Sequence, residues 1–506
     1  MREIISLNEN WTLSFPKGDH ATEQVNLPHT WNAVDGNDGN GSYLRTTGVY
    51  TRTFTTPKQP REGGRTYVEV LAAALNSTVK VNGQVATTHE GGFSIFRADV
   101  TDLCHAGENE LTIEVSNEDT PSMYPSSADF TFYGGLYRGV NLISVPNAHF
   151  DLDYYGGPGM MVTPVPTEDG GANFTIKSFV TNPADDLTVM YSIEDCFGRE
   201  VASAVRGSAD TEVTIYVPDA QLWSMDEPNL YTVVATLQRN NEEVDEIAAN
   251  VGVRSFKVTP DEGFSINGVP TPLRGVSRHQ DRVFEGNALT AEEHYDDAML
   301  IKELGANTIR LAHYQHSQDF YDACDEIGFA VWAEIPFISV FKKGEGAHKH
   351  VMEEMKELII QNYNHPSIMF WGISNEILIG GISQELVDTH HDLEKLCKEL
   401  DPTRPRPPSR TLTRPPPRSR ARTSSRPCAH PSPPRQPPRH RAHRAWPSFS
   451  ANHSRRQCHG RLPPHRRRRK QSPRQTSERD PLPRSRHHGR HRRHHRRLSA
   501  HASSRA

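Results

Sequence analysis

The composition of the chain changes abruptly near residue 405, and this break limits what the 506 residues can fold into. Residues 401–506 contain 29 Arg, one Lys and three acidic residues, whereas residues 1–400 contain 59 acidic and 27 basic residues. No Val, Ile, Met or Tyr follows Pro405. A segment this charged and this poor in large apolar side chains cannot offset the entropy that it would lose on ordering. We therefore expect a disordered basic tail at 406–506 and folded domains before it.

Two segments have the pattern of all-β domains. Residues 1–146 contain short stretches of alternating apolar and polar residues between glycine-rich turns, which is typical of a β-sandwich or jelly roll. Residues 147–257 continue this pattern, with roughly the size and strand content of an immunoglobulin-like sandwich.

From residue 258 the pattern changes to apolar strands that alternate with amphipathic helices. Four strand–helix pairs follow one another up to residue 405, which predicts a parallel sheet with helical crossovers. The predicted strands are apolar nearly throughout, as expected when both faces of a sheet are covered. A (β/α)8 TIM barrel takes about 250 residues, so we interpret residues 258–405 as the first half of such a barrel.

Polar residues are concentrated where the predicted parallel strands end, which is where active sites form in such sheets. The run IMFWGISNE at 368–376 is the most informative, because an apolar strand leads directly to Asn375 and Glu376. A carboxylate is costly to bury unless it is paired. The other residues at strand ends are His279, Arg310, His313 and Glu334.

Each of these residues also has a structural explanation. A single histidine near a strand end is more often hydrogen-bonded within the fold than a ligand contact, and this applies to His279 and His313. Glu334 could pair with a neighbouring arginine, and Glu376 could be half of a buried ion pair. Three helical acids are expected on a solvated face: Asp322, Asp325 and Glu326.

Four stretches together resemble glycoside hydrolase family 2, most closely its β-galactosidases. They are DFTFYGGLYRGV at 129–140, GVSRHQDR at 275–282, NTIRLAHYQHSQDFYDACDEIGFAVWAE at 307–334 and NHPSIMFWGISNE at 364–376. The resemblance implies a sugar-binding jelly roll, an immunoglobulin-like domain and a TIM barrel that hydrolyses terminal non-reducing β-D-galactose residues with retention. A β-glucuronidase of the same family and a non-catalytic carbohydrate-binding remnant are the alternatives.

The resemblance also implies roles for individual residues. Glu376 is similar to the general acid/base of the family, and Asn375 to the neighbour that hydrogen-bonds the sugar 2-hydroxyl. Arg310 resembles the residue that orients the nucleophilic carboxylate. The remaining sugar contacts implied are His279, His313 and, from the first domain, Asp129.

Two departures from the family pattern bear on the site. Gln280 and Gln315 stand where many relatives have Glu and Pro. Members with an active-site magnesium carry Glu-x-His after the third strand, whereas Ile335, Pro336 and Phe337 follow Glu334 here. We therefore expect no metal and no other cofactor.

The second carboxylate that a retaining glycosidase needs is absent from the predicted site. Such enzymes place two carboxyl groups about 5 to 5.5 Å apart, and the family nucleophile is a Glu beyond residue 405. The one Glu in that region is Glu478, which no apolar strand precedes. We expect no nucleophile, an Arg310 without its carboxylate partner, and impaired hydrolysis. The excess of Arg, Pro, Ser, His and Ala is typical of a GC-rich gene translated out of frame.

The remaining features bear on location and partners. The chain has no CxxC pair, no basic and apolar leader, and no apolar run that could cross a bilayer, so we expect a cytoplasmic protein without a membrane partner. The basic tail would attract polyanions, but it has few aromatic residues, and we expect no specific nucleic-acid partner. A full-length relative is expected to form a homo-oligomer.

Overall fold

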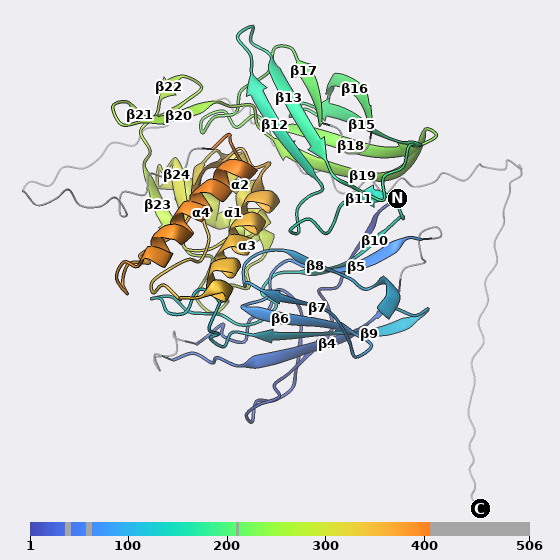
Figure 1. Cartoon of the computed structure of the whole chain (residues 1–506), viewed down its shortest axis with the longest axis vertical. Coiled ribbons are helices and arrows are strands. Elements are labelled where there is room, and N and C mark those ends of the chain that lie inside the picture. Colours follow the sequence, from blue (N-terminus) through green and yellow to red (C-terminus); the bar gives the residue numbers. More distant parts are fainter. Residues whose placement is uncertain (36–41, 57–62, 209–211, 405–506) are drawn as a thin grey trace, which may run out of the picture. The chain divides into compact units, whose positions relative to one another are not determined.

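The computed structural model describes residues 1–35, 42–56, 63–208 and 212–404 (Figure 1). The tail predicted to be disordered, at 406–506, and Glu478 lie outside the described residues. Among the described residues, no helix is both long enough and apolar enough to span a membrane.

The first part of the chain forms two antiparallel sheets. Its strands are β1 (Glu3–Ser6), β2 (Trp11–Ser14), β3 (Glu23–Val25), β4 (Thr47–Thr55), β5 (Arg65–Val70), β6 (Asn76–Val81), β7 (Gln84–Glu90), β8 (Phe96–Asp99), β9 (Glu108–Ser116) and β10 (Val140–Val145). One sheet has the order β3-β2-β4-β9-β6-β7 and the other β1-β10-β5-β8. Every second residue of β9 is buried, so one face of that strand lies on the core, as the alternating pattern predicts. This confirms the predicted sandwich.

A second β-sandwich follows. Its strands are β11 (His149–Phe150), β12 (Met160–Pro166), β13 (Ala172–Ser178), β14 (Val180–Thr181), β15 (Leu187–Glu194), β16 (Glu200–Ser208), β17 (Glu212–Val217), β18 (Tyr231–Arg239) and β19 (Glu242–Val251). Sheets with the orders β12-β13-β17 and β16-β15-β18-β19 enclose a core that includes Phe174, Tyr191 and Val233. A small sheet follows, formed by β20 (Phe256–Thr259), β21 (Gly263–Ile266) and β22 (Val269–Pro270).

The last described part is a four-stranded parallel sheet with helices between its strands (Figure 1). The elements are β23 (Gly275–Arg278), α1 (Ala291–Glu303), β24 (Thr308–Leu311), α2 (Gln318–Ile327), β25 (Ala330–Glu334), α3 (Glu345–Asn362), β26 (Ile368–Gly372) and α4 (Gln384–Leu400). The strand order follows the chain, as in a (β/α)8 barrel. This confirms the predicted half barrel.

Local signals in the sequence set the helix ends. Thr290 caps α1 with a capping box, because its hydroxyl accepts from the backbone N–H of Glu293 while the Glu293 carboxylate accepts from Thr290. Gly328 ends α2 at φ +84°, and a side-chain carbon there would lie 2.5 Å from the Met225 carbonyl oxygen. Only glycine adopts this conformation without strain or a clash.

The first strand of the parallel sheet is more exposed than the strands that follow it. Three of four residues in β23 are exposed, whereas four of five residues in β25 and in β26 are buried. Among the described residues β23 pairs with β24 alone and β26 with β25 alone. The prediction that every strand is covered on both faces is therefore wrong for β23. An unpaired edge alone does not explain this, because β26 also lacks a described outer neighbour and is nevertheless buried.

Candidate active site

The carboxyl ends of three parallel strands bring the predicted site residues together. Arg310 lies within β24, Glu334 is the last residue of β25, and Asn375 follows β26 by three residues. The sheet register pairs Arg310 with Trp332, and Glu334 with Gly372. Because parallel strands end on the same side of a sheet, the polar side chains of these three segments converge there.

Glu334 is the hub of this cluster. Its side chain is 2% exposed. Arg310 Nε donates to Glu334 Oε1 at 2.5 Å, and Arg310 Nη2 donates to Glu334 Oε2 at 3.0 Å. His313 Nδ1 lies 3.0 Å from the same Oε2 atom. The geometry is a bidentate arginine–carboxylate pair with a histidine as third member.

This pairing decides whether Glu334 is a candidate catalytic group or the structural partner of a neighbouring arginine. Both carboxylate oxygens accept hydrogen bonds, and the side chain is 2% exposed, so the group is not open to a sugar. The structural explanation, pairing with a neighbouring arginine, is the correct one. Arg310 is not left without a carboxylate, because Glu334 on the adjacent strand supplies one. The nucleophilic carboxylate that Arg310 was expected to lose is not found among the described residues.

Asn375 is fixed by the same arginine. Arg310 Nη2 donates to Asn375 Oδ1 at 2.7 Å. The backbone N–H of Asn375 donates to the Phe337 carbonyl, and the Asn375 carbonyl accepts from Ser339. Because the amide oxygen faces Arg310, the amide NH₂ group is directed away from it and is available to donate to a ligand hydroxyl.

Glu376 presents its carboxylate to solvent. The residue is exposed, and its side chain makes no hydrogen bond or ion pair with any described residue, so the buried ion pair weighed as an alternative is wrong for this part of the chain. Its backbone has φ +51°, a left-handed conformation that is costly for a residue with a side chain. Such strain persists only where the surroundings enforce it, and it is common at functional sites.

Histidines and an aromatic residue form another wall of the site. His279 Nδ1 lies 3.0 Å from the Tyr314 hydroxyl. The Phe130 ring, from the first domain, lies 4.8 Å from the His279 ring and 6.1 Å from the His313 ring. Burial, and then the nearby His313, lower the pKa of His279, while the Asp129 charge opposes this. Asp129 itself is exposed.

The structure thus brings four predicted site residues into contact, which are His279, Arg310, His313 and Asn375. Asp129 lies close enough for its charge to act on His279, and Glu376 directly follows Asn375 in the chain. Sequence reasoning missed Phe130 and Tyr314 as members. Both stand inside the stretches quoted for the family resemblance, and Phe130 directly follows Asp129. An aromatic residue next to a predicted sugar contact was the available signal, since flat apolar rings often line sugar sites.

A second polar cluster lies at the opposite ends of the strands. Asp322, Asp325 and His365 are close enough together to hold a metal ion. However, His365 Nδ1 lies 2.6 Å from Asp325 Oδ2, and His365 Nε2 lies 3.0 Å from Gln318 Oε1. Burial opposes ring protonation, but the Asp325 carboxylate outweighs it and raises the pKa of His365. A ring that donates from both nitrogens has no lone pair for a metal.

Asp325 also corrects a prediction. It was expected on the solvated face of a helix, yet it is 2% exposed and accepts from the backbone N–H of Ser367 at 2.9 Å. The helical pattern alone could not predict this, because its partners come from the loop before β26.

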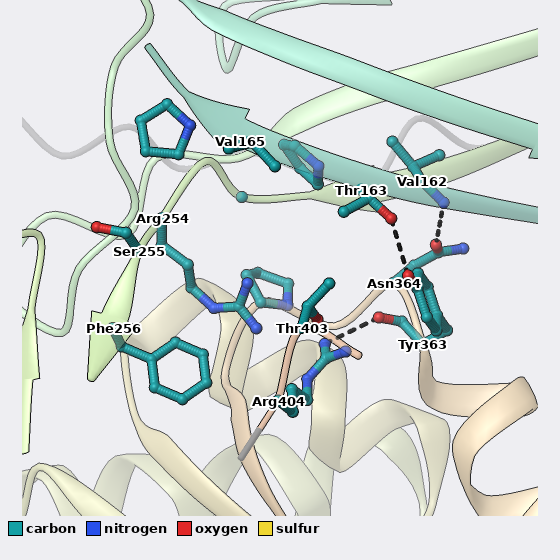
Figure 2. Close-up of a pocket in the computed structure, with 14 residues that line it drawn as sticks. Val162, Thr163, Val165, Arg254, Ser255, Phe256, Tyr363, Asn364, Thr403 and Arg404 are labelled. Carbon is teal, nitrogen blue, oxygen red and sulfur yellow. Dashed lines mark hydrogen bonds between the residues drawn. The ribbon is translucent and has the colours of Figure 1, made fainter. Parts of the chain in front are cut away.

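A cavity of about 370 Å³ lies between the second sandwich, the loop that enters β26 and the segment that follows α4 (Figure 2). Arg254, Phe256, Tyr363 and Arg404 line it, together with apolar residues of β12. Arg254 donates to the Ile368 carbonyl at 3.1 Å, but its buried Nε has no partner, and it forms no ion pair with a described residue. Burial and the like charge of Arg404 lower the pKa of Arg254 to about 9.

Three family models match successive parts of the chain. "Glycosyl hydrolases family 2, sugar binding domain" matches residues 4–146, "Glycosyl hydrolases family 2" matches 160–254, and "Glycosyl hydrolases family 2, TIM barrel domain" matches 256–407. Together they match more than half of the chain.

Individual proteins match the same region. The crystal structure of an FMN-binding β-glucuronidase from Faecalibacterium prausnitzii L2-6 is similar at 83% identity and a TM-score of 0.79, over 80% of this chain and 63% of that chain. A β-glucuronidase of Bacteroides fragilis is 33% identical over 80% of this chain and 60% of the relative. A β-galactosidase of Bacteroides ovatus is 29% identical over 74% of this chain and 47% of the relative. The chain therefore spans about 60% of the length of these two β-glucuronidases.

The pairing of Arg310 with Glu334 predicts a large stability effect. Arg310→Met leaves a buried carboxylate with only His313 beside it, and we expect the free energy of unfolding to fall by about 3 kcal/mol, the lower end for a broken buried pair because Arg310 is 35% exposed. Urea unfolding followed by far-UV circular dichroism measures this, since the four described α-helices all lie in the half barrel.

Glu376→Gln is the matched control for this measurement. Its carboxylate is exposed and has no described partner, so the expected change stays within about 0.5 kcal/mol. Equal effects of the two substitutions would contradict the assignment of Arg310 and Glu334 as the structural pair and of Glu376 as the free group.

Proposed function

We propose that this chain, which belongs to glycosyl hydrolase family 2, carries the acid/base half of a retaining glycosidase site that acts on β-glucuronides. The observation that carries the proposal is the arrangement at the end of β26. There, Glu376 is held in a strained conformation with a free carboxyl group next to Asn375, which Arg310 orients. The similarity to β-glucuronidases at 83% and 33% identity favours glucuronides over the galactosides expected at first.

In this proposal each residue has a separate task. Glu376 protonates the leaving oxygen of the glycosidic bond and then takes a proton from the attacking water. The Asn375 NH₂ group donates to a hydroxyl of the sugar. His279 and His313 line the sugar site, Asp129 lies near its rim, and Arg310 holds Asn375 in place.

The second carboxylate has to come from outside the described residues. Glu334 lies at the same strand ends, but its two oxygens are occupied by Arg310 and His313. A nucleophile on a later barrel strand would complete the pair at about 5 to 5.5 Å. Without it, the chain binds and orients a sugar but lacks the group that forms the covalent intermediate, and we expect hydrolysis far below that of a full-length relative.

We further propose that residues 406–506 are an out-of-frame translation product. The TIM-barrel match ends at residue 407, beside the composition break near residue 405. Resequencing the gene tests this, and we expect the relatives' barrel sequence to continue in another reading frame. One uninterrupted frame through codon 405 into the arginine-rich segment, with no barrel sequence in either other frame, would contradict it.

A chimera tests the catalytic proposal. Residues 1–404 are joined to the remainder of the F. prausnitzii β-glucuronidase, which is 83% identical in the shared part. We expect this chimera to cleave p-nitrophenyl β-D-glucuronide in strong preference to the galactoside. Glu376→Gln should lower kcat on a natural alkyl glucuronide by about 10²- to 10⁴-fold, the usual contribution of a general acid.

The outcomes separate the alternatives. A preference for the galactoside would favour the β-galactosidase reading. If the chimera binds glucuronic acid in calorimetry but does not cleave the glucuronide, the reading as a carbohydrate-binding remnant would be favoured. Full activity of the Glu376→Gln chimera would contradict the role of Glu376.

A second proposal concerns the cavity in Figure 2. The F. prausnitzii structure is described as FMN-binding, and FMN combines a phosphate with a planar aromatic ring system. Arg254 offers a guanidinium without a described carboxylate partner, while Phe256 and Tyr363 offer aromatic surface. The cavity, about 370 Å³, lies within the usual range of about 300 to 1,000 Å³ for ligand pockets. We propose that FMN binds here with its phosphate at Arg254.

Flavin fluorescence tests this proposal in the full chain. Titration with the protein should quench FMN saturably, and riboflavin, which lacks the phosphate, should bind at least tenfold more weakly. Arg254→Met should weaken FMN binding at least tenfold, whereas Arg199→Met, an exposed arginine of the second sandwich, should not. Tight FMN binding that Arg254→Met leaves unchanged would place the flavin elsewhere.

A further inference from the structure

Arg138 reaches from the first domain into the half barrel without an acidic partner. It is 7% exposed and lies in the segment just before β10. Its Nη2 donates to Gln280 Oε1 at 3.1 Å and to the Gln315 carbonyl at 3.0 Å, and its Nη1 donates to the Phe93 carbonyl at 2.8 Å. It forms no ion pair with a described residue, so its charge is balanced by neutral acceptors alone.

The two barrel residues that Arg138 contacts are neighbours of site residues. Gln280 directly follows His279, and Gln315 directly follows Tyr314. His279 Nδ1 and the Tyr314 hydroxyl are 3.0 Å apart. One guanidinium therefore binds next to both partners of this hydrogen bond, on the segments that leave β23 and β24.

Aromatic rings of the first domain support the same pair. The Phe93 ring stacks on Tyr314 with a centroid distance of 4.3 Å and an interplanar angle of 7°. Phe130 covers His279 at 4.8 Å. Phe93 also supplies the carbonyl that Arg138 binds. The first domain thus fixes Tyr314 and His279 from several directions.

We propose that Arg138 is a positioning residue of the active site, which sets the His279–Tyr314 hydrogen bond by clamping Gln280 and Gln315. The glutamine at 280 matters because it holds the guanidinium without neutralising it. A glutamate there would give Arg138 an ion pair and would place a negative charge beside His279. The assignment rests on the proposed function only in taking His279 as a sugar contact.

The charges around His279 make this testable. The groups that act on its ring are His313 and Arg310 from the barrel, Asp281 from its own loop and Asp129 from the first domain. Burial is the largest cause that lowers the pKa of His279. Arg138 faces two further buried histidines, His294 and His316, and contributes to lowering the pKa of both.

Histidine-selective NMR of the full chain tests the proposal without relying on catalysis. The His279 ring is labelled with carbon-13 and assigned from a His279→Gln variant. Gln280→Glu should raise its proton affinity severalfold, because it adds a negative charge on the residue next to His279 in the chain, and the pairing with Arg138 offsets part of that charge. Arg138→Met should change the His279 tautomer ratio, because the Tyr314 hydroxyl is no longer held at Nδ1, and Arg138→Lys should restore it in part.

Arg52→Met is the matched control. Arg52 is a half-buried arginine of the first domain that donates to the carbonyls of Leu7 and Glu9. The Arg52→Met variant should leave both the titration of His279 and its tautomer ratio unchanged. If Gln280→Glu and Arg138→Met also leave both unchanged, the positioning role is overturned. If Arg138→Met does not fold, Gln280→Glu and Arg138→Lys decide the question. Because no substrate is used, failure here is distinct from failure of the chimera.

Discussion

The ion pair between Arg310 and Glu334 is the interaction on which the candidate site depends. A carboxylate that is 2% exposed is tolerable only with compensating partners, and Arg310 and His313 occupy both of its oxygens. Arg310 also binds Asn375, so the pair links the ends of β24 and β25 with the loop that follows β26. The orientation of Asn375, and with it the path of the backbone into Glu376, follows from this cluster.

A buried ion pair is an expensive way to gain stability, because the desolvation of two charges offsets most of their attraction. Its value here is geometric. The planar guanidinium meets a carboxylate bidentately and still has a donor for an amide oxygen, which fixes three segments in one arrangement. Glu376, in contrast, has no described partner, and a proton donor needs that freedom to approach a substrate oxygen. The two carboxylates at these strand ends thus have opposite environments, since Glu334 is buried and paired while Glu376 is exposed.

The sequence allowed prediction of the two sandwiches and the half barrel, because strand and helix periods are local features. Strand-end polarity singled out the candidate residues of the barrel, whereas Asp129 and the roles of all six site residues were predictions from the family resemblance. The sequence did not settle the partners of those residues. The pairing of Glu334 with Arg310 depends on the register of two strands, and the burial of Asp325 depends on a loop about 40 residues further along the chain. The contacts of Arg138 and Phe130 with the barrel were beyond prediction because they depend on how the first domain packs against it.

We propose above all that this chain holds a proton donor and a sugar site without a nucleophile among the described residues. Incubation of the full chain with 2-deoxy-2-fluoro-β-D-glucuronyl fluoride, followed by intact-mass measurement, tests this directly, with the F. prausnitzii enzyme as the labelled control. The mass of the chain should stay unchanged, while the control should gain one fluoroglucuronyl group. A stoichiometric adduct on any Asp or Glu of this chain would contradict it.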